Sequence, residues 1–141
     1  MKAKKFKFTV HQLKWLDALE SGKFKKAYGQ LVELKKDEET VKGYCCLGVA
    51  CEVLGKPFGI KRVAEKFSLP KHDTEDAVLP ERLYKLLRLR TEEGELDNSL
   101  DILKDTAVAT TLVDLNDKAR WSHKKIAQYI RKNPENVFET K

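Results

Sequence analysis

The sequence predicts an α+β fold in which a small β-hairpin packs against a short buried helix and several amphipathic helices. Three observations indicate this class. Apolar residues recur at helical spacing near both ends of the chain, an alternating apolar–polar stretch follows the first of these segments, and residues 43–52 are small and mostly apolar. Because 141 residues are enough to build one hydrophobic core, we expect a single domain over residues 1–141.

The first predicted helix begins after Thr9. Gln12 stands three residues later and completes a capping box, in which each of the two side chains satisfies a backbone N–H of the other residue. Ser21-Gly22 is a typical helix end. We expect the buried face to be formed by the apolar residues Val10, Leu13, Leu16 and Leu19.

A β-hairpin is predicted next. Residues 29–35 alternate between apolar and polar side chains, which indicates a first strand. Residues 36–39 are polar and suited to a turn, and residues 40–44 are expected to form the second strand.

A short helix is predicted over Cys46–Leu54, ended by Gly55-Lys56-Pro57. Both of its faces are apolar, so it should be buried nearly all round. A glycine inside a helix costs about 1 kcal/mol relative to alanine, and Gly48 therefore indicates the close approach of another backbone. We expect this segment to be the packing centre, with the structural core residues Cys45, Cys46, Leu47, Gly48 and Cys51.

The middle of the chain has weaker patterns. Residues 56–78 are predicted to be irregular, with one or two helical turns over residues 62–67. Pro80 at a first helical position should open an amphipathic helix that runs to Leu89. Residues 91–99 have the composition of a polar loop with a short strand or hairpin at its edges.

The C-terminal third predicts a helical hairpin. One helix should begin at Asp105 and end near Asn116-Asp117. Ser122 should cap the last helix, which Asn133-Pro134 ends. The short linker between the two helices favours antiparallel packing.

Charge is distributed unevenly along the chain, whose net charge is +6. Residues 1–36 carry ten lysines against three acidic residues, and residues 118–141 carry seven basic against two acidic residues, whereas the middle is acidic. If the termini lie side by side, the two basic segments form one positive face that attracts phosphates. The alternative is that these lysines only solvate the surface.

The same sequence excludes several function classes. No long apolar run is present that would serve as a signal peptide or a membrane span, so we expect a cytoplasmic protein with no membrane partner. Three cysteines within seven positions make a poor disulfide framework and suit a reducing compartment. No spacing of cysteine and histidine matches the common zinc sites, and we predict no metal and no cofactor.

The cysteines are the first candidates for chemistry. Cys45 and Cys46 lie where a strand runs into a helix, and a helix N-terminus favours a thiolate, so one of them could act as a nucleophile or a redox switch. The alternative is that buried cysteines pack as small apolar groups, and no catalytic partner stands at a recognisable spacing. We therefore predict no catalytic residues.

Several segments together resemble a group of small proteins from bacteriophages and prophages. They are Trp15-Leu-Asp-Ala-Leu-Glu-Ser-Gly-Lys-Phe, the core Tyr44-Cys-Cys-Leu-Gly-Val-Ala-Cys51, Leu79-Pro80, Leu115-Asn-Asp117 and the helix that contains Ile126-Ala127. The resemblance spans nearly the whole chain. It implies a viral origin and action in the cytoplasm of an infected bacterium, where small phage proteins often counter host defences.

These observations lead to a ranked set of functional hypotheses. The first is a phage accessory protein, acting in anti-defence or host takeover, that sequesters a nucleotide-derived immune signal on a basic, aromatic surface. The second is an interaction module that binds nucleic acid or a host protein, with homo-oligomers possible, and the third is a cysteine-dependent enzyme. The ligand-binding residues that we predict are Lys42, Tyr44, Arg120, Trp121, Ser122, His123 and Lys124.

Overall fold

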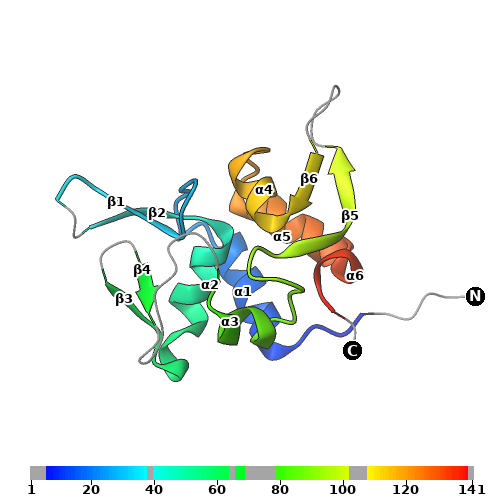
Figure 1. The fold of residues 1–141 in the computed structure, drawn as a ribbon, viewed down its shortest axis with the longest axis horizontal. Helices are drawn as coiled ribbons and strands as arrows, with labels where there is room; N and C mark the ends of the chain where they lie inside the picture. The colour runs from blue at the N-terminus through cyan, green and yellow to red at the C-terminus, as the bar shows by residue number, and fades with distance from the viewer. Residues whose placement is uncertain (1–5, 38–39, 64–65, 69–78, 102–107, 140–141) are drawn as a thin grey trace, which may run out of the picture.

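The computed structural model has an α+β fold, as predicted (Figure 1). It describes residues 6–37, 40–63, 66–68, 79–101 and 108–139. Three antiparallel two-stranded sheets and seven helical elements occur in these ranges. In chain order they are α1 (Val10–Glu20), β1 (Val32–Leu34), β2 (Val41–Tyr44), α2 (Cys46–Leu54), the 3-10 helix η1 (Lys56–Phe58), β3 (Lys61–Val63), β4 (Lys66–Ser68), α3 (Glu81–Leu86), β5 (Glu95–Asp101), β6 (Val108–Thr111), α4 (Leu112–Asp117), α5 (His123–Lys132) and α6 (Pro134–Val137).

Helix α1 begins as predicted, but a different face is buried. The Thr9 hydroxyl accepts from the Gln12 N–H at 3.1 Å, and the Gln12 side chain accepts from the Thr9 N–H at 2.9 Å. The prediction that Val10 and Leu13 face the core is wrong, since they are 78% and 38% exposed. The buried residues are Gln12, Trp15, Leu16 and Leu19. The Gln12 amide is satisfied there because it donates to the Leu87 carbonyl at 2.9 Å.

The predicted hairpin is confirmed as β1 and β2, with a register shift between Glu33 and Leu34. Residue 26 forms a parallel bridge with Tyr44, so the chain before β1 also lies along β2. Gly43 permits this approach, because a Cβ on it would meet the carbonyl of Lys26. The residue 26 segment is therefore held against the end of β2.

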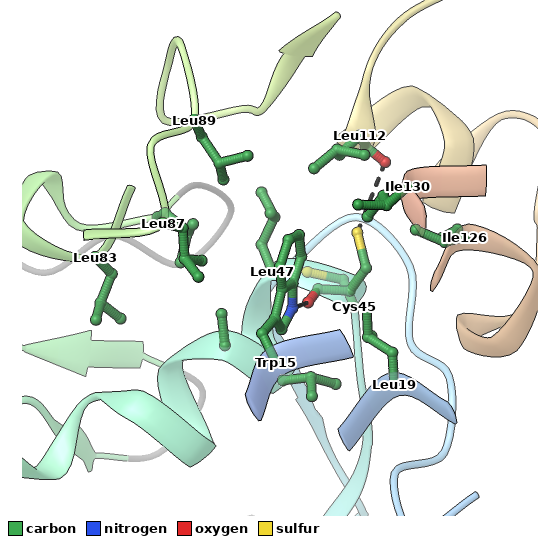
Figure 2. Packing of buried hydrophobic residues seen from close by; sticks show 14 of the residues in the cluster. Trp15, Leu19, Cys45, Leu47, Leu83, Leu87, Leu89, Leu112, Ile126 and Ile130 are labelled. Carbon is green, nitrogen blue, oxygen red and sulfur yellow. Dashed lines mark hydrogen bonds between the residues drawn. The ribbon is translucent and has the colours of Figure 1, made fainter. Parts of the chain in front are cut away.

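Helix α2 is the packing centre that the sequence predicts. Seven of its nine residues are buried, Cys45 caps its start, and Gly55 follows its last turn. A Cβ added to Gly48 would lie far inside van der Waals contact with the Leu31 carbonyl, so the glycine allows the two backbones to touch. Figure 2 shows Trp15 beside Leu47, with the indole N–H donating to the Cys46 carbonyl at 2.9 Å.

Two predictions for the middle of the chain are wrong. Lys61–Val63 and Lys66–Ser68 are the antiparallel strands β3 and β4 and replace the helical turns predicted over residues 62–67, since the two segments pair with one another. Helix α3 ends at Leu86 instead of Leu89, and Arg88 has a φ of 63° that no helix tolerates. The predicted strand near residues 91–99 is confirmed as β5, which pairs with β6.

The predicted helix from Asp105 is also corrected. Residues 108–111 form strand β6, and α4 begins only at Leu112 after the N-cap Thr111. The β-branched side chains in this segment favour a strand: Val108, Thr110 and Thr111. The Thr111 hydroxyl then accepts a hydrogen bond from the Asp114 N–H at 3.1 Å and caps α4. Asp105 lies outside the described residues. Helices α4 and α5 still form the predicted helical hairpin.

The last helices bring the two ends of the chain together. Ser122 caps α5 by accepting from the Lys125 N–H at 3.0 Å, and Pro134 follows as the first residue of α6. Phe138 then stacks on Phe6 with ring centroids 6.0 Å apart and lies edge-on to Trp15 at 6.4 Å. Residues from all six α-helices contribute to one buried cluster. None of the helices in the described ranges combines the length and apolar character needed to cross a membrane.

We expect the Gly48→Ala variant to be less stable than the wild type by about 3 kcal/mol, because the added methyl group overlaps the Leu31 carbonyl. Chemical denaturation monitored by the fluorescence of the two tryptophans measures this difference. Gly22→Ala is the control, since its Cβ meets nothing within 4 Å and only its φ of 77° is strained, at about 1 kcal/mol. Equal losses in the two variants would contradict the close approach.

Candidate functional site

The Asn116 side chain, which is fully buried, joins three segments that are distant in sequence. Its Oδ1 accepts from the Cys46 N–H at 3.1 Å and from the Lys26 ammonium. Its Nδ2 donates to the Ala27 carbonyl at 2.9 Å and to the Asp117 carboxylate at 2.7 Å. We call these five residues the Asn116 junction. Every hydrogen-bonding position of the amide is used, so the junction fixes where the segment around Lys26 lies.

Just outside the junction, two cations lie over the ring of Tyr28. The Arg120 guanidinium carbon is 4.3 Å from the Tyr28 ring centroid, and the Lys26 Nζ is 5.4 Å from the same centroid. Both distances are in the range of cation–π contacts. We call Lys26, Tyr28 and Arg120 the Tyr28 site. One cation comes from each basic segment of the chain, so the two segments meet here.

The backbone of Arg120 is strained. Its φ is 56°, in the left-handed region that glycine normally occupies, and this costs an arginine about 1 kcal/mol. The neighbouring Trp121 N–H donates to the Leu115 carbonyl at 3.0 Å, which fixes the linker between α4 and α5. Strained positions of this kind concentrate at functional sites.

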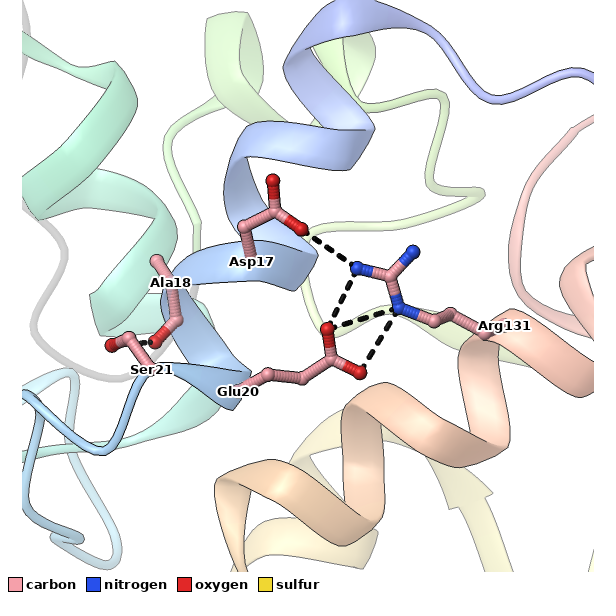
Figure 3. Close-up of polar contacts among 5 residues, drawn as sticks. All are labelled: Asp17, Ala18, Glu20, Ser21 and Arg131. Carbon is pink, nitrogen blue, oxygen red and sulfur yellow. Dashed lines mark hydrogen bonds and ion pairs between the residues drawn. The ribbon is translucent and has the colours of Figure 1, made fainter.

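The Arg120 guanidinium is also free of acceptors. Within the described ranges, no hydrogen bond or ion pair is formed by this group, and the side chain is exposed. Arg131 differs, because it donates to Glu20 at 2.7 Å and to Asp17 at 2.8 Å (Figure 3). These ion pairs join α5 to α1 and occupy the Arg131 guanidinium.

A second ring–cation pair adjoins the Tyr28 site. The Lys125 Nζ lies 4.5 Å from the Trp121 ring, and Trp121 contacts Tyr129 edge-on at 5.9 Å. Ser122 uses its hydroxyl as the α5 N-cap, while Lys124 is exposed on the first turn of the helix. The linker between α4 and α5 therefore carries three of the predicted ligand-binding residues, Arg120, Trp121 and Ser122, and Lys124 follows on the first turn of α5.

The remaining predicted residues have other environments. Lys42 forms an ion pair with Glu33 across the hairpin at 3.3 Å. Tyr44 is half-buried, with its ring edge-on to Phe24 at 5.3 Å, and its backbone carbonyl accepts from Ala27.

The expectation that His123 is exposed is wrong. It is 5% exposed, and neither ring nitrogen has a hydrogen-bond partner within the described part of the chain. Burial, with the nearby positive charge of Lys26, lowers the pKa of His123 to about 4. The ring is therefore neutral at physiological pH and packs behind the basic surface.

All three cysteines are buried and free. Burial raises the pKa of the Cys45 thiol to about 11, although Cys45 accepts from the Gly48 N–H at 3.3 Å. Burial also raises the pKa of Cys46 and of Cys51. The sequence hypothesis of an activated thiolate at the start of α2 is disfavoured, because the thiol form predominates and solvent does not reach it.

The described residues contain no cluster of three or more histidine, cysteine, aspartate or glutamate side chains placed to hold a metal ion. His72, which could complete a zinc site with the three cysteines, lies outside the described residues.

Sequence reasoning missed the residues at the centre of the site: Lys26, Tyr28, Asn116 and Asp117. The first two lie in an undistinguished basic stretch, and their position becomes visible only through the bridge between residue 26 and Tyr44. The buried Asn116 had one signal, since Leu115-Asn-Asp117 belongs to the motifs that carry the family resemblance.

The fold and the site define a small α+β protein with a buried cysteine-containing helix and a basic, aromatic surface. A family model described as a domain of unknown function, DUF8296, matches residues 7–134, and the chain belongs to this family. Searches of curated proteins and of solved structures found no match.

His123 should make stability depend on pH. Its pKa is lower in the folded protein than the ordinary value of 6.5, so the unfolded chain binds the proton more strongly. Stability should therefore fall as the pH decreases from 6.5 to 4, by at most about 1 kcal/mol per pH unit. Urea denaturation of wild type and His123→Leu across this range should give a flatter profile for the variant.

The control for this comparison is His11→Gln, since His11 is exposed on α1. It should keep the wild-type slope. A His123→Leu slope equal to that of the wild type would show that His123 does not titrate in this range.

The cysteines should react slowly in the folded protein. At pH 8 a thiol with a pKa of about 11 is about 0.1% thiolate, and all three thiols are shielded from solvent. Reaction with dithiobis-nitrobenzoate should be at least about 100-fold slower in the native protein than in guanidinium, where three thiols should react. A rapidly reacting thiol in the native protein would restore the nucleophile hypothesis.

Proposed function

We propose that the protein binds an anionic small ligand that carries an aromatic ring, a nucleotide-derived signal, at the Tyr28 site. The observation that carries this proposal is the Arg120 guanidinium, which lies 4.3 Å from the Tyr28 ring without any acceptor among the described residues. A guanidinium stacked on a ring keeps its edge available, and that edge matches the two oxygens of a phosphate or carboxylate.

The arrangement favours binding because it is formed in advance. The α4–α5 linker holds Arg120 by the hydrogen bond from Trp121 to Leu115, and the Tyr28 ring restricts the side chain. A ligand therefore loses little free energy to the ordering of this arginine. A nucleobase can stack on the exposed face of the guanidinium or beside Trp121.

The biological role that we infer is sequestration. The described cysteines are buried and protonated, and the Tyr28 site holds cations and rings instead of a nucleophile with its base. A phage accessory protein that removes a nucleotide immune signal from the host cytoplasm would need this kind of surface. The assignment of phage origin rests on the sequence resemblance.

Nucleic-acid binding is the second candidate, and Lys124 and Lys125 on the first turn of α5 favour it. Two observations favour the small ligand. The ion pairs of Arg131 with Asp17 and Glu20 remove one cation from the same helix, and Lys125 is placed over Trp121. Binding to duplex DNA would weaken steeply with salt, with a slope that counts the phosphate contacts.

Arg120→Gly tests the proposal without disturbing the backbone. Glycine fits a φ of 56° with less strain than arginine, so the melting temperature should be equal or higher, while the guanidinium is removed. Isothermal titration with cyclic dinucleotides, ADP-ribose and AMP should give binding to the wild type for at least one of them. We expect the variant to bind that ligand at least about tenfold more weakly.

Arg88→Gly is the matched control. Arg88 has a φ of 63° and is exposed, but it follows α3 instead of α4. Its affinity should equal that of the wild type. No heat from any ligand at tens of micromolar protein, or equal affinities in Arg120→Gly and wild type, would overturn the proposal.

A further inference from the structure

We propose that Lys26 is the second cation of the Tyr28 site and that, with Arg120, it selects a ligand with two separate negative charges, of the nucleoside diphosphate class. This inference rests on the proposed function and specifies its ligand. Nothing in the sequence pattern marks Lys26 for this role. The position of its ammonium group beside the same ring as Arg120 does so.

The first argument is geometric. The Lys26 Nζ and the Arg120 guanidinium lie 5.4 Å and 4.3 Å from one centroid, so their separation cannot exceed the sum of these distances. Two phosphates joined by one bridging oxygen span such a separation when each accepts from one cation. A single phosphate contacts both cations only if they lie at the short end of the range.

The second argument concerns the charge of Lys26. The ammonium is half-buried, and the hydrogen-bond acceptor that the structure gives it is the neutral Asn116 Oδ1. Burial lowers the pKa of Lys26, although the Asp117 carboxylate acts in the opposite direction. The protein thus stabilises this cation less well than water does, and an added anion would supply the missing stabilisation.

The third argument is that the Lys26 ammonium is held in a fixed position. The Asn116 amide is saturated by its other contacts and holds the ammonium in place, while Asp117 is itself engaged by the Gly29 N–H at 3.0 Å and by Asn116. Lys26 has three N–H donors, so donors remain for a ligand after the bond to Asn116. The Asn116 junction therefore presents a fixed point charge beside a stacked guanidinium.

The experiment compares adenosine, AMP and ADP by isothermal titration at one pH and one ionic strength. We expect adenosine to bind weakest and ADP to bind at least about tenfold more tightly than AMP. The ADP affinity should also fall more steeply with salt than the AMP affinity. In Lys26→Gln, which keeps a donor for Asn116, the ADP affinity should drop toward that for AMP.

Lys25→Gln is the control, since it removes a lysine charge one residue away from an exposed position. It should keep the wild-type ratio of ADP to AMP affinity. Equal wild-type affinities for AMP and ADP would overturn the role of Lys26 while leaving the proposed function intact, whereas no binding of any of the three would count against both. The wild-type ratio and its salt dependence decide the matter even if Lys26→Gln does not fold.

Discussion

The structure depends on one buried amide. The Asn116 side chain links the start of α2, the chain at residues 26–27 and the end of α4, and each of its four hydrogen bonds has a partner on one of these segments. Because a buried polar group without partners costs 1–3 kcal/mol, about that much is lost if any of the three segments moves away. The packing of α2 and the position of the Tyr28 site therefore depend on the same hydrogen bonds of this amide.

Local sequence signals predicted the parts of the fold that depend on contacts between residues close in sequence, such as the helix starts. The capping residues Thr9 and Ser122 fixed the starts of α1 and α5, and Gly48 with its small neighbours indicated a helix in close contact with another backbone. The β6 strand was missed because Val108 and Leu112 also fit a helical period, and pairing with β5 decided the outcome. Gln12 replaced Val10 on the buried face since its amide reaches the Leu87 carbonyl.

The candidate site was predictable only in part. Arg120 and Trp121 stand in a recognisable basic, aromatic stretch, but their partners Tyr28 and Lys26 are about ninety residues away in sequence. No short-range pattern reports such a contact. The basic neighbours of His123 predict an exposed ring, whereas the structure buries it on the first turn of α5. The side chains that position the site are thus long-range contacts, which propensity and periodicity do not detect.

The contact between the two ends of the chain has a consequence for synthesis on the ribosome. Helix α2 is made soon after α1 and packs on it, but Phe138, which lies against Phe6 and Trp15, and Arg131, which binds carboxylates of α1, are made more than 75 residues after α2. Until then Trp15 and Leu16 have an incomplete core to pack against. A translating ribosome therefore exposes an unfinished apolar surface for most of the elongation time, and the nascent protein is a natural substrate for chaperones that bind such surfaces.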